Sequence, residues 1–121
     1  RLEGNEQRTR VRLHVDRPIR ASIFTLGDPY RVIIDVANLD FRLPPGTGRT
    51  GHGLVSAFRY GQFEAGRSRI VMDASAPVLI ENAQLVSLGG KDPHHLAFEL
   101  VRITPDRFAA MAGEARATGL T

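Results

Sequence analysis

Two stretches of this sequence decide its fold: residues 9–19 read TRVRLHVDRPI, and residues 68–78 read SRIVMDASAPV. Both begin with a hydroxyl residue and an arginine, continue with an apolar residue at every second position, and end in proline followed by a β-branched residue. A constant shift of 59 positions relates them, from Thr9 to Ser68. The match indicates that one unit occurs twice in the chain.

A second match lies further along each copy. Residues 28–36 read DPYRVIIDV and residues 92–100 read DPHHLAFEL, now at a shift of 64 positions. The additional residues fall around Ser87 to Lys91, a turn-rich stretch of the kind that tolerates insertions. Asp35 and Glu99 therefore occupy equivalent positions. The long period and the small number of copies argue against a solenoid and favour two interlocked halves of one domain.

Each copy reads as a series of β-strands. In the first copy Val11, Leu13 and Val15 alternate with polar residues, and such alternation is typical of a strand with one buried face. We expect strands over residues 9–15, 19–26, 31–36, 54–60, 68–74, 78–85 and 96–103. Short strands joined by hairpin turns predict an all-β fold, a sandwich of two symmetry-related antiparallel sheets from an internal duplication.

The C-terminal segment has a different pattern. Thr104 and Pro105 form a helix start signal, and apolar residues then recur at helical spacing from Phe108 to Ala115. We expect a short C-terminal helix packed on the sandwich or, alternatively, a linker to a further domain over residues 104–121. Residues 8–103 then form the core of a single domain over residues 1–121.

Composition excludes several classes of function. The chain has no cysteine, so a disulfide scaffold and a thiolate metal site are excluded. No apolar run approaches the roughly 20 residues that span a bilayer. The net charge is +3, with 16 basic and 13 acidic residues, and the basic residues are spread through the strands. This distribution, with no tryptophan, argues against nucleic-acid binding.

Three motifs that suggest a cofactor, a metal or catalysis have simpler explanations. Residues 46–51 fit the pattern G-x-G-x-x-G, but prolines precede them and a strand follows, so we expect a mobile, glycine-rich surface loop. His94 and His95 fall in the turn before a strand, and adjacent strand residues point to opposite faces. No nucleophile elbow surrounds any serine. We therefore expect no cofactor, no metal and no catalytic residues.

Arginines and carboxylates on the outward strand positions remain. The guanidinium group binds carboxylates and carbonyls in fixed geometry, and nearly all basic residues here are arginine. These outward residues suit a polymer that carries hydroxyls, amides and carboxylates; alternatively, they form a solvated face with scattered ion pairs. Asp35 and Glu99 could form a catalytic pair if their strands met, but the simpler interpretation pairs each with an arginine such as Arg10 or Arg69.

Three segments then resemble a known family. Residues 31–36 read RVIIDV, residues 55–62 read VSAFRYGQ and residues 68–73 read SRIVMD, and in this order they are similar to the AMIN domain. The resemblance covers most of residues 9–102, and departs from the family pattern at Ser68, where threonine is usual, and in the long loop of residues 44–53.

The resemblance implies a non-catalytic, periplasmic module that binds peptidoglycan and brings an attached N-acetylmuramoyl-L-alanine amidase to the division septum. Because AMIN domains also occur in type IV pilus secretins, the alternative is a protein-interaction module that docks on a division-site protein or a secretin assembly. Whether the glycan strand or the stem peptide is contacted stays open. The candidate binding residues are Arg10, Arg12, Arg31, Asp35, Arg59, Gln62, Arg69 and Asp73.

Overall fold

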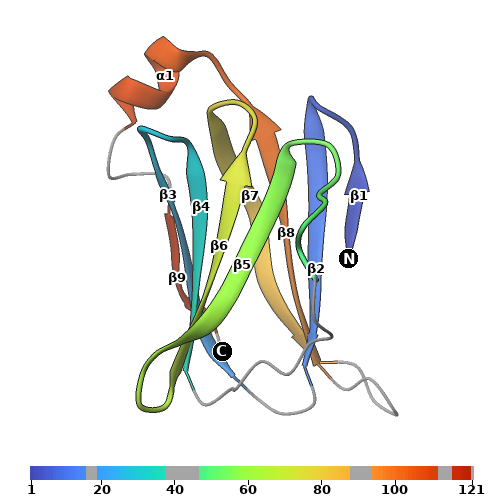
Figure 1. Ribbon diagram of the computed structural model, residues 1–121, viewed down its shortest axis with the longest axis vertical. Helices are drawn as coiled ribbons and strands as arrows, with labels where there is room; N and C mark the ends of the chain where they lie inside the picture. Colours follow the sequence, from blue (N-terminus) through green and yellow to red (C-terminus); the bar gives the residue numbers. More distant parts are fainter. Residues whose placement is uncertain (16–18, 38–46, 88–93, 112–115, 121) are drawn as a thin grey trace.

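The computed structural model describes residues 1–15, 19–37, 47–87, 94–111 and 116–120. Its strands are β1 (Leu2–Gly4), β2 (Arg8–Val15), β3 (Arg20–Leu26), β4 (Arg31–Ala37), β5 (Val55–Glu64), β6 (Arg67–Ala74), β7 (Val78–Ser87), β8 (His94–Arg102) and β9 (Arg116–Leu120), with one helix, α1 (Pro105–Ala110). They form two antiparallel sheets (Figure 1). Sheet A has the order β1-β2-β8-β7, and sheet B the order β5-β6-β4-β3-β9. The predicted all-β sandwich is confirmed.

The register of the strands shows how the two copies interlock. In sheet A Arg10 lies opposite Glu99, and in sheet B Arg69 lies opposite Asp35. Arg10 and Arg69 are related by the shift of 59 positions, and Asp35 and Glu99 by the shift of 64. The same two positions of the repeat therefore lie opposite each other in both sheets. Because β2 pairs with β8 and β6 pairs with β4, each sheet combines the first strand of one copy with later strands of the other copy. The duplication therefore cannot separate into two independent halves.

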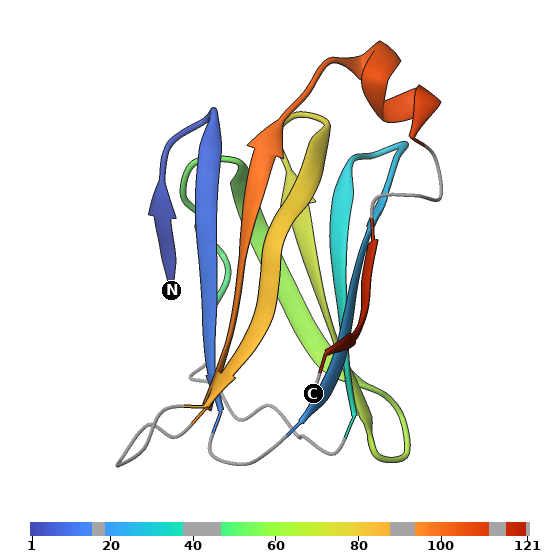
Figure 2. The same cartoon turned by 180° about the vertical axis from the view of Figure 1, so that it is seen from behind.

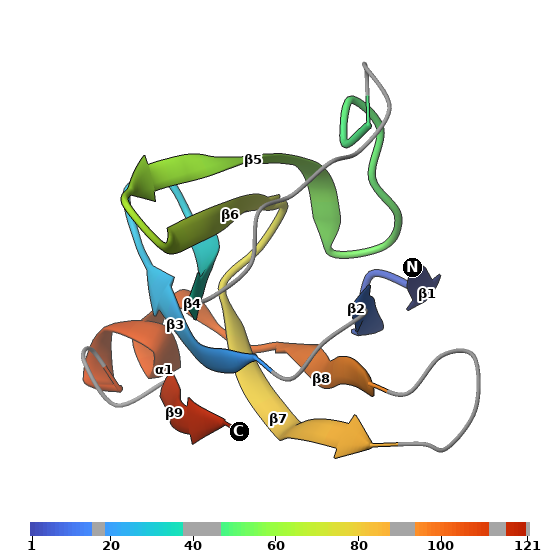
Figure 3. The same ribbon diagram turned by 90° about the horizontal axis from the view of Figure 1, so that it is seen from below.

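The apolar core lies between the sheets, which form two layers when viewed from below (Figure 3). Alternation directs one side of each strand inward, so Val11 of β2 and Ile70 of β6 are both buried. The largest fully buried side chains include Phe98 of β8 and Ile34 of β4, which occupy equivalent positions. Both sheets thus contribute matched positions to one shared core.

Two buried hydroxyl residues also occupy equivalent positions, Thr9 at 0% exposure and Ser68 at 1%. The Thr9 hydroxyl donates to the Asn5 carbonyl at 2.8 Å and accepts from the Leu54 backbone N–H at 2.9 Å. Thr9 therefore links the β1–β2 turn to the residue that precedes β5. This link explains how a polar side chain is tolerated in the core, since buried polar groups are stable when hydrogen-bonded.

The loop before β5 is held more firmly than its glycine content predicts. Within the described residues 47–54, the Gly48 carbonyl accepts from the Phe58 N–H, and His52 Nε2 lies 2.7 Å from the Gly4 carbonyl. A Cβ at Gly51 would overlap the Val55 carbonyl, so the backbone approaches β5 closely there. In this part of the loop, which was expected to be mobile, hydrogen bonds connect the chain to β1 and β5.

The C-terminal segment forms both a helix and a strand. Thr104 caps α1 by accepting from the Arg107 N–H at 3.1 Å, and the Phe108 ring packs edge-on against Tyr30 at 5.0 Å. The helix ends at Ala110 and Met111 is its C-cap, so the prediction that the helix continues through Met111 is wrong. Ala112 and Ala115 lie outside the described residues. β9 was not expected, and it pairs with β3 at the edge of sheet B (Figure 2). Within the described residues, no helix is long and apolar enough to cross a membrane.

Candidate functional site

The candidate binding residues fall on two opposite surfaces. Arg10 and Arg12 lie on the outer face of sheet A, whereas five others lie on the outer face of sheet B: Arg31, Asp35, Arg59, Arg69 and Asp73. The arginines and carboxylates on the outward strand positions therefore do not share one surface. Alternation along a strand tells which side of a sheet a residue occupies, but it does not tell which sheet the strand joins.

Gln62 belongs to neither outer surface. It lies opposite Ser68, whose side chain is buried between the sheets, and it alternates with Phe58 and Tyr60, which pack against the core. Gln62 is exposed. Gln62 nevertheless lines one surface hollow together with Arg59 and Arg69.

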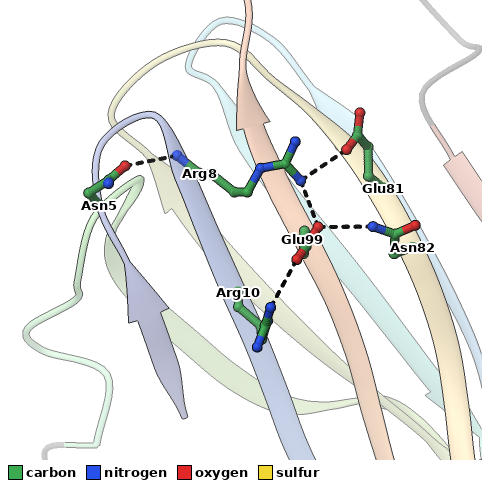
Figure 4. Close-up of polar contacts among 6 residues, drawn as sticks. All are labelled: Asn5, Arg8, Arg10, Glu81, Asn82 and Glu99. Carbon is green, nitrogen blue, oxygen red and sulfur yellow. Dashed lines mark hydrogen bonds and ion pairs between the residues drawn. The ribbon is translucent and has the colours of Figure 1, made fainter.

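On sheet A, five side chains from three strands form a polar network (Figure 4). One amino group of Arg8, on β2, contacts Glu99 on β8 at 2.6 Å and Glu81 on β7 at 3.0 Å. Arg10 reaches the other oxygen of Glu99 at 3.4 Å, and Asn82 donates to Glu99 at 2.9 Å. Glu81 and Glu99 lie directly opposite each other, so Arg8 offsets the repulsion of two adjacent carboxylates.

These contacts favour the charged form of Glu99. The hydrogen bond from Asn82, followed by those from Arg8 and Arg10, lowers the pKa of the Glu99 carboxyl against the opposing effect of burial. Hydrogen bonding to Glu81 first, and then to Glu99, raises the pKa of the Arg8 guanidinium. Folding therefore favours the charged forms of Glu99 and Arg8.

A β-bulge in β7 brings Asn82 into this network. The register shifts between Glu81 and Gln84, and Asn82 adopts a positive φ of 54°. Asparagine is among the few residues that adopt this left-handed conformation readily. The additional residue places Gln84, rather than Ala83, opposite Ala97. Both Asn82 and Gln84 are exposed as a result.

On sheet B the arginines are held by aspartates. Arg69 binds Asp35 through two nitrogens, at 2.7 and 3.1 Å, and this bidentate pair raises the pKa of the Arg69 guanidinium. Arg59 contacts Asp73 at 2.9 Å. Together with the contact between Arg10 and Glu99, these distances confirm that the carboxylates pair with neighbouring arginines.

Arg31 has a different role from the other arginines on sheet B. Its guanidinium donates to the backbone carbonyls of Pro29 at 3.0 Å and Gly27 at 3.3 Å. Arg31 therefore holds the turn between β3 and β4, against which α1 packs. It is less available to a ligand than Arg59, whose side chain is 63% exposed.

The histidines lie in strands and loops without forming a cluster of ligands. His94 and His95 belong to β8 and not to the preceding turn, because β8 pairs with β2 as far as Val15. The rings of His14 and His95 lie 5.7 Å apart across these strands. Among the described residues, no group of three or more histidine, aspartate or glutamate side chains could hold a metal ion.

Sequence reasoning missed part of the network on sheet A. Arg8 has the same outward parity as Arg10 and Arg12, so alternation alone could have identified it. Glu81 and Asn82 gave no comparable signal, because a bulge cannot be recognised from the apolar pattern of β7. The network therefore contains more residues from β7 than the sequence indicated.

The model of one family, the AMIN domain, matches residues 1–100. This match covers every strand of the sandwich from β1 to β7 and most of β8. No curated protein matches the chain.

Proposed function

The chain belongs to the AMIN domain family, and on this premise we propose that it binds peptidoglycan through arginines on the outer faces of its two sheets. AMIN domains are non-catalytic modules of periplasmic proteins that interact with peptidoglycan in general. The finer proposal is that this chain acts in the periplasm and brings an attached amidase to the division septum.

One observation carries the proposal: each outer face presents an arginine that is held by a carboxylate and yet exposed. Arg10 is 50% exposed and contacts Glu99 through one amino group, and Arg59 is 63% exposed and contacts Asp73 through one amino group. Holding a flexible side chain in place lowers the entropy that binding costs. The remaining N–H groups can then donate to carbonyls and carboxylates of the polymer.

The opposite orientation of the two faces suits an extended polymer. Peptidoglycan repeats the same carboxylates and carbonyls along its length, so two separate arginine clusters can engage different parts of it. Weak contacts of this kind add avidity, and single substitutions are expected to have small effects. The test therefore requires double variants.

Cosedimentation with purified, protein-free sacculi tests the proposal. We expect Arg59→Ala with Arg69→Ala, and separately Arg10→Ala with Arg12→Ala, each to weaken binding by about tenfold. The control is Arg102→Ala with Arg107→Ala, which removes the same charge from exposed positions outside both clusters. Folded double variants that pellet like the parent chain would show that the arginines form only a solvated surface.

Targeting is tested separately from binding. A fluorescent fusion of the chain, exported to the periplasm, is expected to concentrate at the septum of dividing cells. The variant with Arg10→Ala and Arg12→Ala should lose this concentration in proportion to its loss of sacculus binding. A fusion that stays evenly distributed while the chain binds sacculi would contradict septal targeting and leave peptidoglycan binding intact.

A further inference from the structure

A groove crosses the outer face of sheet A beside the polar network. Arg12 of β2 lies opposite Ala97 of β8, and Ala97 lies opposite Gln84 of β7. The small side chain of Ala97 forms the floor between the two longer ones. His95 and Glu99, which flank Ala97 on the same side of β8, lie at the two ends. The groove has a volume of about 310 Å³.

The cations along one wall of the groove are available to a ligand. Glu99 is held by Arg8 at 2.6 Å and by Asn82 at 2.9 Å, so its contact with Arg10 at 3.4 Å is the weakest of the three. Arg12 forms no ion pair within the described part of the chain. Two guanidinium groups can therefore bind an anion in the groove while Arg8 and Asn82 still hold Glu99.

The opposite wall carries carboxamides. Gln84 is exposed and faces Ala97 because of the β7 bulge, and Asn82 also lines the groove. A carboxamide both donates and accepts, so it matches the N–H and C=O of a peptide bond. In addition, Nδ1 of His95 is buried and has no hydrogen-bond partner among the described residues, and such atoms are rare in folded proteins.

The equivalent position on sheet B shows that packing alone does not require this groove. There Val71 replaces Arg12, Ile33 replaces Ala97 and, in the absence of a bulge between β3 and β4, Phe24 faces Ile33. Ile33 is 3% exposed, although it lies on the outer side of its sheet. The same framework is thus filled by apolar side chains in sheet B and left as a polar hollow in sheet A.

We propose that this groove binds the stem peptide of peptidoglycan, with a carboxylate at Arg12 and Arg10 and a peptide bond against Gln84. The proposal rests on the proposed function and adds which part of the polymer is recognised. A sugar ring is commonly held by stacking on an aromatic side chain. The groove is lined by two residues with aromatic rings, Phe98 and His95. Phe98 is buried, at 1% exposure, so only the His95 ring could stack on a sugar. The guanidinium and carboxamide groups match an acidic peptide better.

The test titrates the 121-residue chain with three soluble probes while backbone amide NMR signals are recorded. The probes are the disaccharide of N-acetylglucosamine and N-acetylmuramic acid, the same disaccharide carrying a stem peptide, and the stem peptide alone. We expect the two peptide-containing probes to shift signals of β2, β7 and β8 around the groove, with Kd values within about threefold of each other. The peptide-free disaccharide should leave these signals unchanged.

Substitutions then locate the contact. Arg12→Gln should weaken peptide binding by about tenfold, as expected for the loss of a charge-assisted hydrogen bond. Gln84→Ala should weaken it by about threefold, as expected for a neutral one. Arg107→Gln on α1 removes the same charge elsewhere and should have no effect. Because Arg12 holds no ion pair in the described structure, its variant is expected to fold like the parent chain.

The outcomes separate this proposal from the broader one. Unchanged binding of the stem-peptide probe by the Arg12→Gln variant, or equal binding of the peptide-free disaccharide, would overturn the groove as a peptide site and leave peptidoglycan binding standing. If the chain neither cosediments with sacculi nor binds any of the probes, both proposals are overturned.

Discussion

In sheet A an arginine faces a glutamate across β2 and β8, and in sheet B an arginine faces an aspartate across β6 and β4. One row further along, the two sheets differ: Ala97 lies between Arg12 and Gln84, whereas Ile33 lies between Val71 and Phe24. The duplicated framework thus keeps its register and its ion pairs while the adjacent row changes from polar to apolar. The comparison separates what holds the sandwich together from what one face offers to a ligand.

The largest effect is expected from substitutions in the shared core. Phe98 and Ile34 are equivalent residues at 1% and 0% exposure. We expect Phe98→Ala to lower the free energy of unfolding by about 3–5 kcal/mol and Ile34→Ala by about 2–5 kcal/mol, through lost burial and the cavity that remains. Urea denaturation measures both. If either substitution lowers the free energy of unfolding by less than about 1 kcal/mol, the copy of the repeat that contains it contributes little to a common core.

The next largest effect is expected at the buried hydroxyl of Thr9. Thr9→Val keeps the shape of the side chain but leaves the buried Leu54 N–H without its acceptor. The expected cost is about 1–3 kcal/mol in the free energy of unfolding. Hydrogen exchange should show faster exchange of the Leu54 amide in this variant. Ser56→Ala removes an exposed hydroxyl as the control, and an equal cost there would contradict a special role for Thr9.

The ion pairs that the two sheets share are expected to differ in strength. Arg69 and Asp35 form a bidentate, partly buried pair, and a double-mutant cycle with Arg69→Gln and Asp35→Asn should give a coupling of about 1 kcal/mol. The single contact between Arg10 and Glu99, at 3.4 Å, should give less than about 0.5 kcal/mol. Equal couplings would show that geometry does not distinguish the two pairs.

The sequence was sufficient to predict much of this architecture. Alternating residues identified the seven main strands, and the two shifts predicted the equivalence of Asp35 and Glu99 that strand pairing confirms. It was not sufficient to predict β9, because residues 116–120 are held by pairing with β3 and have no alternation of their own.

The candidate site was predicted only in part, for a related physical reason. Local alternation correctly assigned an outward side to Arg10, Arg12, Arg59 and Arg69. Their division between two faces depends on which strands pair, and the groove depends on the bulge at Asn82. Pairing and bulges are set by contacts between distant parts of the chain, so no local pattern reports them.

The smallest effect is expected from acid titration of the network on sheet A. Asn82, Arg8 and Arg10 lower the pKa of Glu99 in the folded chain, so folding favours its charged form. This contribution to stability is fully present above the ordinary glutamate value of 4.5 and is lost as the pH falls through the lower pKa of the folded state. Glu99→Gln should therefore be less stable than the parent chain at pH 7, and the difference should shrink below pH 4.5. Urea midpoints recorded from neutral to acid pH measure this difference, with Glu6→Gln as an exposed control of equal charge change. A difference that stays constant on acidification would show that Glu99 gains nothing from its partners, and the polar network would then serve only to shape the surface beside the groove.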